Sequence, residues 1–582
     1  MPLQDWIHHW EEGAGARMLR VAAAILGFIA MACLYDLLAF QNFTNEEAME
    51  TAQLARNLSE GRGYVTKSIR PLSVYLLQRA GAAGQGAAEV RLPAPDLNNP
   101  PVYPLLLAGL MKVLPFPFTA TQYWFYQPER WIAVFNQALF FGAVVLLFRI
   151  ARRLFDARVA WLAAIIFAGT NLFWKFSVSG LSTVLLLVVF LAVVWCLVGI
   201  EERERAASTG GGGVGLALLA GALVGIGGLT RYAFAWMIVP VVLFVAWVAP
   251  RVRARLCLAS VASFLVVMSP WLARNYAVSG ACFGVAGYAL AEGTPALEGD
   301  RLERSLNPET DLKRVSPLEV ANKFLSNARE MWRDELPRFG GNWVSAFFLV
   351  GLLIPFHSAA LGRVRAFLVF SLVLLFVVQA LGQTHLSAES PEINSENLLV
   401  LLAPLAFVYG VALFYILLDQ LNLGTVDARG AAVGGFIVVL SVPFVTSLLL
   451  GRGSAPNSPY SPLHVQRTAR LVRPGEWMMS DIPGAVAWYG DRTCVWLTLD
   501  ADREFLNVNR LKPVKGVFLT QRTTDEPFLS EMMLKTNSWG HFVMECQAHG
   551  EVPPGFPLTK APAGFLPYQI FLSDQPRWRM PP

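Results

Sequence analysis

Two adjacent carboxylates follow the first long apolar segment of this 582-residue chain. Residues 18–40 are almost wholly apolar, and Glu46 and Glu47 come shortly after them. Because a carboxylate is costly inside a bilayer, this pair is expected at a membrane interface. A carboxylate at that place can act as a general base on a substrate that the membrane holds. We therefore take Glu47 as the first and Glu46 as the second candidate for a catalytic residue.

Several arginines on the same predicted side of the membrane are candidates for binding a phosphate. A guanidinium presents two N–H donors in a fork that matches two phosphate oxygens. The candidate phosphate-binding residues are Arg274, Arg231, Arg56 and Arg70.

An oxygen-rich set of side chains could also hold a metal ion. Glu46, Glu47 and Asp96 offer the hard oxygen ligands that Mg²⁺ or Mn²⁺ prefers. The sequence contains no CxxC or HExxH pattern, so no motif supports a zinc site. Mg²⁺ or Mn²⁺ is thus the one cofactor that these residues suggest.

The same residues have a simpler explanation that involves no chemistry. Carboxylates in the first turn of a helix interact favourably with its dipole, so Glu46, Glu47 and Glu50 could only stabilise an interfacial helix. Arg56 and Arg274 could only extend toward lipid headgroups. His385 stands alone in the sequence and is expected to be structural.

The composition is that of an integral membrane protein. Hydrophobic residues make up 54% of the chain and charged residues only 15%, against about 25% charged residues in an average globular domain. The net charge of +5 is modest and the basic residues are spread over short loops. They indicate membrane topology rather than a surface for nucleic acid.

About eleven apolar segments approach the roughly 20 residues that a spanning helix needs. A further apolar segment, 101–118, is short and rich in proline, so we expect it to lie along the outer side of the membrane without crossing. The predicted spans are 18–40, 131–150, 159–176, 181–200, 213–229, 233–249, 256–271, 342–358, 366–382, 397–418 and 430–450.

The positive-inside rule orients these spans. Arg17 and Arg20 precede the first span, which places the N-terminus in the cytoplasm. The alternation of spans then places the long loops 41–130 and 272–341 outside. Since no eukaryotic targeting or retention signal is evident, we expect a bacterial inner membrane and a periplasmic outer side.

The chain changes character near residue 452, where charge and proline increase. Short apolar runs at 477–480, 494–497 and 516–519 favour strands, and 485–489 favours a helical turn. We therefore predict an α-helical polytopic membrane domain over 1–451 and a small periplasmic α/β domain over 452–582. Cys494 and Cys546 could form a disulfide if this segment is extracytoplasmic.

The order of the outer-side motifs resembles that of the GT-C superfamily of membrane glycosyltransferases. The branch is that of the protein-O-mannosyltransferases and aminoarabinose transferases. The resemblance covers most of residues 18–450. It rests on Glu46-Glu47-Ala48, Arg56-Asn57-Leu58, Asn99-Pro100-Pro101 and Pro270-Trp271-Leu272-Ala273-Arg274-Asn275.

This resemblance implies a polyprenyl-phosphate-sugar as donor and an acceptor that the sequence does not identify: a glycan, a lipid or a protein. It implies that Glu47 or Glu46 replaces the family's aspartate as base, and that Arg274 faces the donor phosphate. Asn99 takes the place of the family's histidine next to that phosphate. Where the family often has Arg-Tyr, this chain has Glu396-Asn397.

Two other functions stay open. One is a transporter of lipid or polysaccharide, although the sequence shows no repeated half. The other is a non-catalytic scaffold for envelope assembly, which the departures from the family motifs favour. In each case the expected partners include membrane lipids and exclude nucleic acid.

Overall fold

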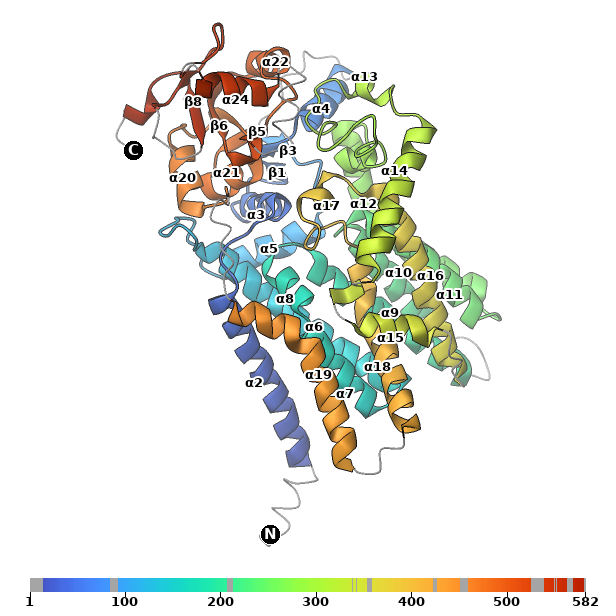
Figure 1. Ribbon diagram of the computed structural model, residues 1–582. Coiled ribbons are helices and arrows are strands. Elements are labelled where there is room, and N and C mark those ends of the chain that lie inside the picture. Colours follow the sequence, from blue (N-terminus) through green and yellow to red (C-terminus); the bar gives the residue numbers. More distant parts are fainter. Residues whose placement is uncertain are drawn as a thin grey trace.

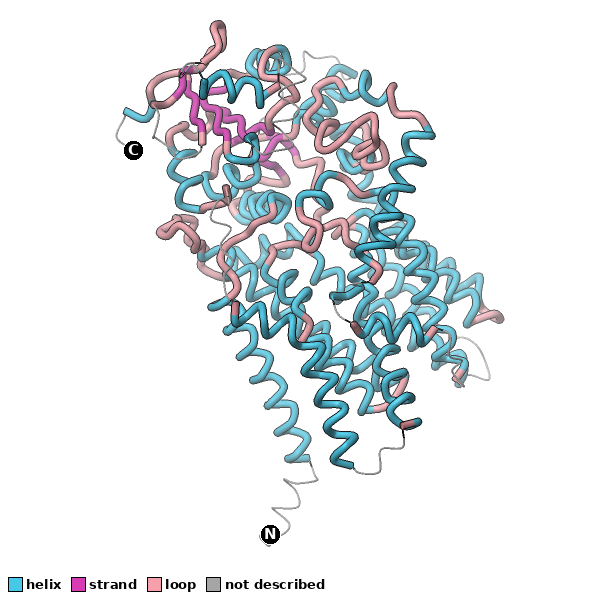
Figure 2. The backbone as a smooth tube through the Cα atoms, in the orientation of Figure 1, coloured by secondary structure: helices cyan, strands magenta, loops and turns pink. Residues whose placement is uncertain are grey.

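The computed structural model describes residues 14–579 except 84–92, 207–212, 338, 342, 353–357, 422–425, 451–458, 525–537, 549, 551 and 563–568. Long helices form a bundle at one end of the molecule, and the strands gather at the other end (Figures 1 and 2). This separation follows from the sequence, because the apolar runs precede residue 450 and the mixed sequence follows it.

Seven helices in the described part of the chain are long and apolar enough to cross a membrane. A bent pair, α7 (Ala157–Ala168) and α8 (Asn171–Val178), would make an eighth span. The seven are α2 (Ala14–Leu38), α6 (Gln127–Leu154), α9 (Thr183–Ala206), α12 (Arg253–Ser279), α16 (Ala359–Gly382), α18 (Ala403–Gln420) and α19 (Val426–Leu449).

The remaining predicted spans coincide with shorter helices. These are α10 (Val214–Gly228), α11 (Ile238–Val248) after the 3-10 helix η1 (Tyr232–Met237), and α15 (Val344–Gly351). Helices therefore occur at all predicted positions, but the count of about eleven crossings stays a prediction. Segment 101–118 contains the 12-residue helix α5 (Val102–Val113), which is about 18 Å long and too short to span a bilayer.

The bundle is organised around α9 and α18. In each of these helices 83% of the apolar window is buried, against 11% in α2 and α19. Close packing elsewhere depends on glycine. A Cβ on Gly221 of α10 would lie 1.9 Å from the carbonyl oxygen of Ser260 in α12. Small residues at such positions let two membrane helices approach closely.

A six-stranded sheet lies at the opposite end, in the order β2-β5-β4-β6-β8-β7. The first four strands are parallel and the last two pairings are antiparallel. The strands are β2 (Ser68–Ile69), β4 (Trp477–Ser480), β5 (Thr493–Trp496), β6 (Val514–Leu519), β7 (Thr559–Lys560) and β8 (Ile570–Ser573). The helices of this end are α20 (Pro462–Arg470), α21 (Pro483–Gly490), α22 (Arg503–Leu511) and α24 (Trp539–Ala548).

The strands predicted near 477, 494 and 516 and the helix near 485 are confirmed. The sheet, however, crosses the predicted boundary at residue 452, because β2 from the loop 41–130 pairs with β5. The disulfide considered between Cys494 and Cys546 is not formed, since both are free and buried, one in β5 and one in α24.

A layer of short helices lies between the bundle and the sheet (Figure 1). It includes α3 (Glu46–Ser59), which contacts both α5 and α21. The other helices of the long loops between the apolar helices are α4 (Pro71–Ala83), α13 (Pro308–Leu312), α14 (Pro317–Glu330) and α17 (His385–Glu389). The candidate carboxylates therefore lie at the junction of the two ends.

Candidate active site

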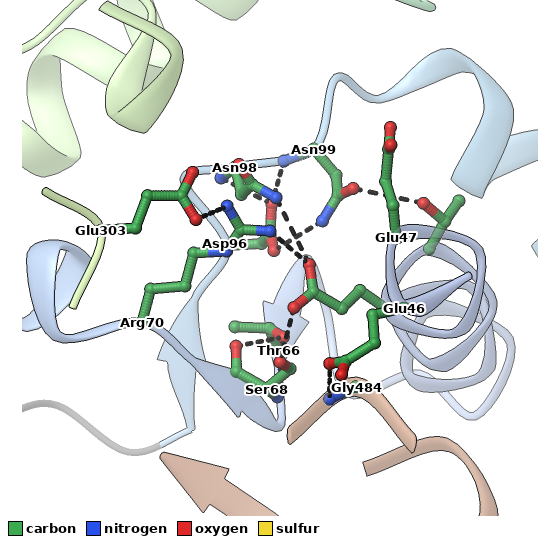
Figure 3. A network of polar contacts seen from close by, with 12 residues as sticks. Glu46, Glu47, Thr66, Ser68, Arg70, Asp96, Asn98, Asn99, Glu303 and Gly484 are labelled. Atoms are coloured by element: carbon green, nitrogen blue, oxygen red, sulfur yellow. Dashed lines mark hydrogen bonds and ion pairs between the residues drawn. The ribbon is translucent and has the colours of Figure 1, made fainter. Parts of the chain in front are cut away.

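The start of α3 presents Glu46 and Glu47 to different surroundings. Asn45 caps the helix, and its side chain accepts a hydrogen bond from the Glu47 N–H at 2.9 Å. An α-helix turns about 100° per residue, so neighbouring side chains project in different directions. Figure 3 shows Glu46 extending toward Gly484 and Glu47 extending away from it.

Glu46 faces the segment that carries the sheet, and both of its oxygens have partners. Oε1 accepts hydrogen bonds from Arg522 at 2.7 Å and from the hydroxyl of Tyr460 at 3.4 Å. Oε2 accepts one from the N–H of Gly484 at 3.2 Å. Burial raises the pKa of Glu46 to about 8, although the charge of Arg522 opposes this rise.

Glu47 faces the bundle and is only half paired. Its Oε1 lies 3.3 Å from a guanidinium nitrogen of Arg231, which follows the end of α10. Its Oε2 is buried and has no hydrogen-bond partner in the described part of the chain. Burial lowers the pKa of Arg231, while the charges of Glu47 and Glu396 oppose that shift. Glu47 thus has one oxygen available for a proton.

Asp96 and Asn99 form the turn that precedes α5. Asp96 accepts hydrogen bonds from the N–H groups of Asn98 and Asn99 at 3.1 and 2.7 Å, and from the Asn99 side chain at 3.2 Å. Burial raises the pKa of Asp96, which these hydrogen bonds partly offset. Asn99 in turn accepts a hydrogen bond from Thr51 of α3 at 3.2 Å. The turn is therefore fixed to the helix that bears Glu47.

Arg274 ties α12 to the same turn. One guanidinium nitrogen donates to the carbonyl of Asp96 at 2.7 Å, and another lies 3.4 Å from the carbonyl of Tyr64. The guanidinium also lies over the rings of Trp271 and Tyr64, at 4.8 and 5.4 Å from their centroids. Arg274 thus lies next to Asp96 in the candidate site. The same contacts also fix the backbone at Tyr64 and Asp96.

The two remaining arginines have carboxylate partners elsewhere. Arg70 lies between Glu50 at 3.0 Å and Glu303 at 2.5 Å, and all three side chains are buried. Arg56 pairs with Glu60 at 3.0 Å and lies 3.5 Å from Asp491. The structure therefore brings Arg231 to Glu47, and Arg274 and Asn99 to Asp96, but it engages Arg70 and Arg56 in separate ion pairs.

The three oxygen-bearing side chains considered for Mg²⁺ or Mn²⁺ do not point to one place. Glu46 is directed to Gly484, Glu47 to Arg231, and Asp96 to the backbone of its own turn. The metal requirement thus stays a prediction. In the described part of the chain, the group with suitable spacing for a metal is Glu292, Glu303 and His385.

A large cavity borders the Glu46 side of the junction. It has a volume of about 1600 Å³ and is lined by Thr44, Tyr460, Arg522, Glu389 and Lys175, among others. Pockets for small ligands usually measure about 300–1,000 Å³, so this cavity has room for a larger substrate. Arg522 forms its wall and also pairs with Glu389.

Sequence reasoning missed Arg522, which lies 476 residues from its partner Glu46. No local pattern encodes such a distant contact. One signal could have found it, because Asp481 and Arg522 follow the carboxyl ends of the parallel strands β4 and β6, where ligand-binding residues of α/β sheets collect. Asp481 fixes the Arg522 turn by accepting hydrogen bonds from Thr520 and Thr523.

Comparisons with known proteins agree with this architecture. Residues 98–273 match the family described as dolichyl-phosphate-mannose-protein mannosyltransferase. The structure of ArnT from Cupriavidus metallidurans bound to undecaprenyl phosphate aligns with a TM-score of 0.53 at 10% identity, covering 96% of this chain and 99% of that one. An oligosaccharyltransferase of Archaeoglobus fulgidus, tethered to an acceptor peptide, aligns with a TM-score of 0.50 at 11% identity, covering 88% and 70%.

The chain has the fold of the GT-C glycosyltransferases. The resemblance found in the sequence is thereby confirmed. A comparison with curated proteins finds no significant match in sequence. The family match includes Asn99 and Arg231 but neither Glu46, Glu47 nor Arg274, so the roles of the latter three rest on the geometry of this chain.

Proposed function

We propose that this protein transfers a sugar from a polyprenyl-phosphate donor to an acceptor at the outer face of the membrane. The GT-C fold supports the class of reaction. The observation that carries the proposal is the pair formed by Glu47 and Arg231, in which one carboxylate oxygen contacts the guanidinium and the other has no partner among the described residues.

This pair supplies the two groups that the reaction needs. Oε2 of Glu47 accepts the proton of an acceptor hydroxyl, and the freed oxygen forms a bond to the anomeric carbon of the sugar. The bond from that carbon to the phosphate oxygen breaks, and its electron pair leaves with the polyprenyl phosphate. Arg231 stabilises the negative charge that collects on this phosphate. Donor binding also draws Arg231 away from Glu47, which frees the carboxylate.

Glu46 is a poorer base on the same grounds. Three donors occupy its oxygens, and its pKa of about 8 leaves it largely protonated at neutral pH. Glu47 lies in the first turn of α3. Its side chain is longer than the aspartate of the related motifs, so its carboxylate can still reach the acceptor hydroxyl. In this scheme Glu46 holds α3 against the sheet.

The surrounding residues divide between donor and acceptor. Arg274 and Asn99 shape the turn beside α5, whose apolar surface suits the polyprenyl chain. The cavity bordered by Arg522 and Tyr460 lies on the Glu46 side of α3 and has room for a part of the acceptor remote from its reacting hydroxyl. This scheme places the loops 41–130 and 272–341 and the segment 452–582 in the periplasm, with the N-terminus in the cytoplasm of a bacterial inner membrane. Any use of Mg²⁺ or Mn²⁺ remains part of the proposal.

The test is sugar release or transfer from a panel of radiolabelled polyprenyl-phosphate-sugars by the purified full-length protein. We expect turnover of one donor and a loss of at least about 100-fold in Glu47→Gln. Glu60→Gln is the matched control, because Glu60 caps the other end of the same helix and forms its ion pairs with Arg56 and Arg62. Binding of donor lipid without turnover by the wild type would instead favour a non-catalytic scaffold.

A further inference from the structure

Three buried side chains converge at a place separate from Glu47. Glu292, Glu303 and His385 are 2%, 6% and 7% exposed. One ligand atom from each lies within 4.8 Å of the others. They come from two outer loops, the first after the 3-10 helix η2 (Gly284–Tyr288) and the second at the start of α17.

Each of the three side chains keeps one ligand atom without a partner among the residues that the structure describes. Nδ1 of His385 lies 2.8 Å from Oε1 of Glu292, and Oε2 of Glu303 accepts a hydrogen bond from Arg70. Oε2 of Glu292, Oε1 of Glu303 and Nε2 of His385 take part in no hydrogen bond or ion pair with the described residues.

The backbone around these ligands is held in place. Lys323 donates hydrogen bonds to the carbonyls of Ala289 and Glu292 at 2.7 and 2.5 Å. The carbonyl of Glu303 accepts a hydrogen bond from the N–H of Leu72 at 3.0 Å. Supporting contacts of this kind orient the ligands of a metal site.

The local charge also favours a cation. The buried carboxylates Glu50, Glu292 and Glu303 face the guanidinium of Arg70 and the imidazole of His385, so these acidic groups outnumber the cationic ones even when His385 is protonated. Buried negative charge requires compensation. Arg70 donates a hydrogen bond to Oε2 of Glu303. It would therefore orient this ligand of the metal without binding the metal itself.

We propose that Glu292, Glu303 and His385 bind a divalent transition-metal ion of the zinc class. An imidazole with two carboxylates suits zinc, whereas Mg²⁺ prefers oxygen ligands and retains its waters. Three protein ligands leave one coordination position open, and His385 lines the large cavity, which gives that position an approach from solvent. The ion links the two outer loops. The ion pairs of Arg70 with Glu303 and with Glu50 connect the metal site to α3.

This site does not depend on the proposed sugar transfer, so its test needs no donor. Purified full-length protein is freed of metal with a chelator and titrated with Zn²⁺, and bound metal is measured by elemental analysis. We expect about one Zn²⁺ per chain. His385→Asn and Glu292→Gln should weaken binding at least about tenfold. His541→Asn is the matched control, because His541 pairs with Glu545 on α24. Equal binding by all variants would overturn the proposal.

A spectroscopic measurement keeps the proposal testable if a variant fails to fold. Co²⁺ added to the metal-free wild type should give the visible absorption band of a four-coordinate cobalt site. Zn²⁺ should abolish this band and Mg²⁺ should not. In His385→Cys the same ion should gain a thiolate charge-transfer band that the wild type lacks. No cobalt spectrum in the wild type, or one that Mg²⁺ removes equally well, would contradict a zinc-class site.

Discussion

Glu46 and Glu47 are neighbours in the sequence, yet they lie in contrasting environments. On the sheet side, Glu46 is held by Arg522, Tyr460 and the backbone of Gly484. On the bundle side, Glu47 contacts only Arg231 and leaves one buried oxygen without a partner in the described chain. A fully paired buried carboxylate stabilises an interface, whereas a half-paired one costs stability and is available for chemistry.

Among the tests of the contrast between Glu46 and Glu47, we expect the largest change in activity from a substitution of Arg231. Arg231→Lys keeps the positive charge but loses the fork that binds two phosphate oxygens. The rate constant kcat should fall about 10²–10³-fold, with a smaller rise in the KM for the donor. Steady-state kinetics with the active donor measures both, and Arg62→Lys on the exposed loop is the control. An unchanged kcat would remove Arg231 from the site.

On the sheet side, Arg522→Met should act on stability instead. It leaves Glu46 and Glu389 without their shared cation. Because Glu46 already holds a proton for most of the time at neutral pH and Glu389 is exposed, we expect a cost of about 2 kcal/mol rather than the full cost of an isolated buried charge. A lowered thermal midpoint with a modest change in kcat is the expected result. A collapse of kcat at an unchanged midpoint would place Arg522 in the chemistry.

Glu46 should also give stability a dependence on pH. Its pKa is about 8 in the folded protein against an ordinary 4.5, so the folded state binds more protons than the unfolded state between these values. The free energy of unfolding therefore falls as the pH rises from about 4.5 to about 8. Glu46→Gln should flatten this slope in thermal unfolding, with Glu60→Gln as control. An equal slope in both variants would contradict the burial of Glu46.

The smallest effect is expected at Thr51, which only supports the turn beside the site. Thr51→Val removes the hydrogen bond to Asn99 and should cost about 1 kcal/mol of stability. Transfer should change less than about threefold, since neither residue touches the reacting atoms in this account. A large loss of kcat with unchanged unfolding would show that Asn99 does bind the donor.

Much of this architecture could be predicted from hydropathy and local motifs. Segments such as 181–200 and 397–418 are helices, and the apolar runs at 477 and 516 are strands. Such elements are predictable because their signals are local. The position of Glu46 and Glu47 in the first turn of a helix follows from Asn45 and the two acidic residues.

The contacts that distinguish the two glutamates were not predictable. Arg522 and Gly484 contact Glu46 from the segment that forms most of the sheet, and β2 joins that sheet from the loop 41–130. His385 appeared structural because its partners Glu292 and Glu303 lie far away in the sequence. Periodicity and spacing specify which residues a helix presents, but they do not specify which distant segment packs against them.

The most direct test of the central claim is single-turnover sugar transfer by the wild type, Glu47→Gln and Glu46→Gln under identical conditions with the same labelled donor. The account predicts a rate lowered at least about 100-fold in Glu47→Gln and within about tenfold of the wild type in Glu46→Gln, with donor binding retained in both. A greater loss in Glu46→Gln than in Glu47→Gln would contradict it and assign the base to the sheet side.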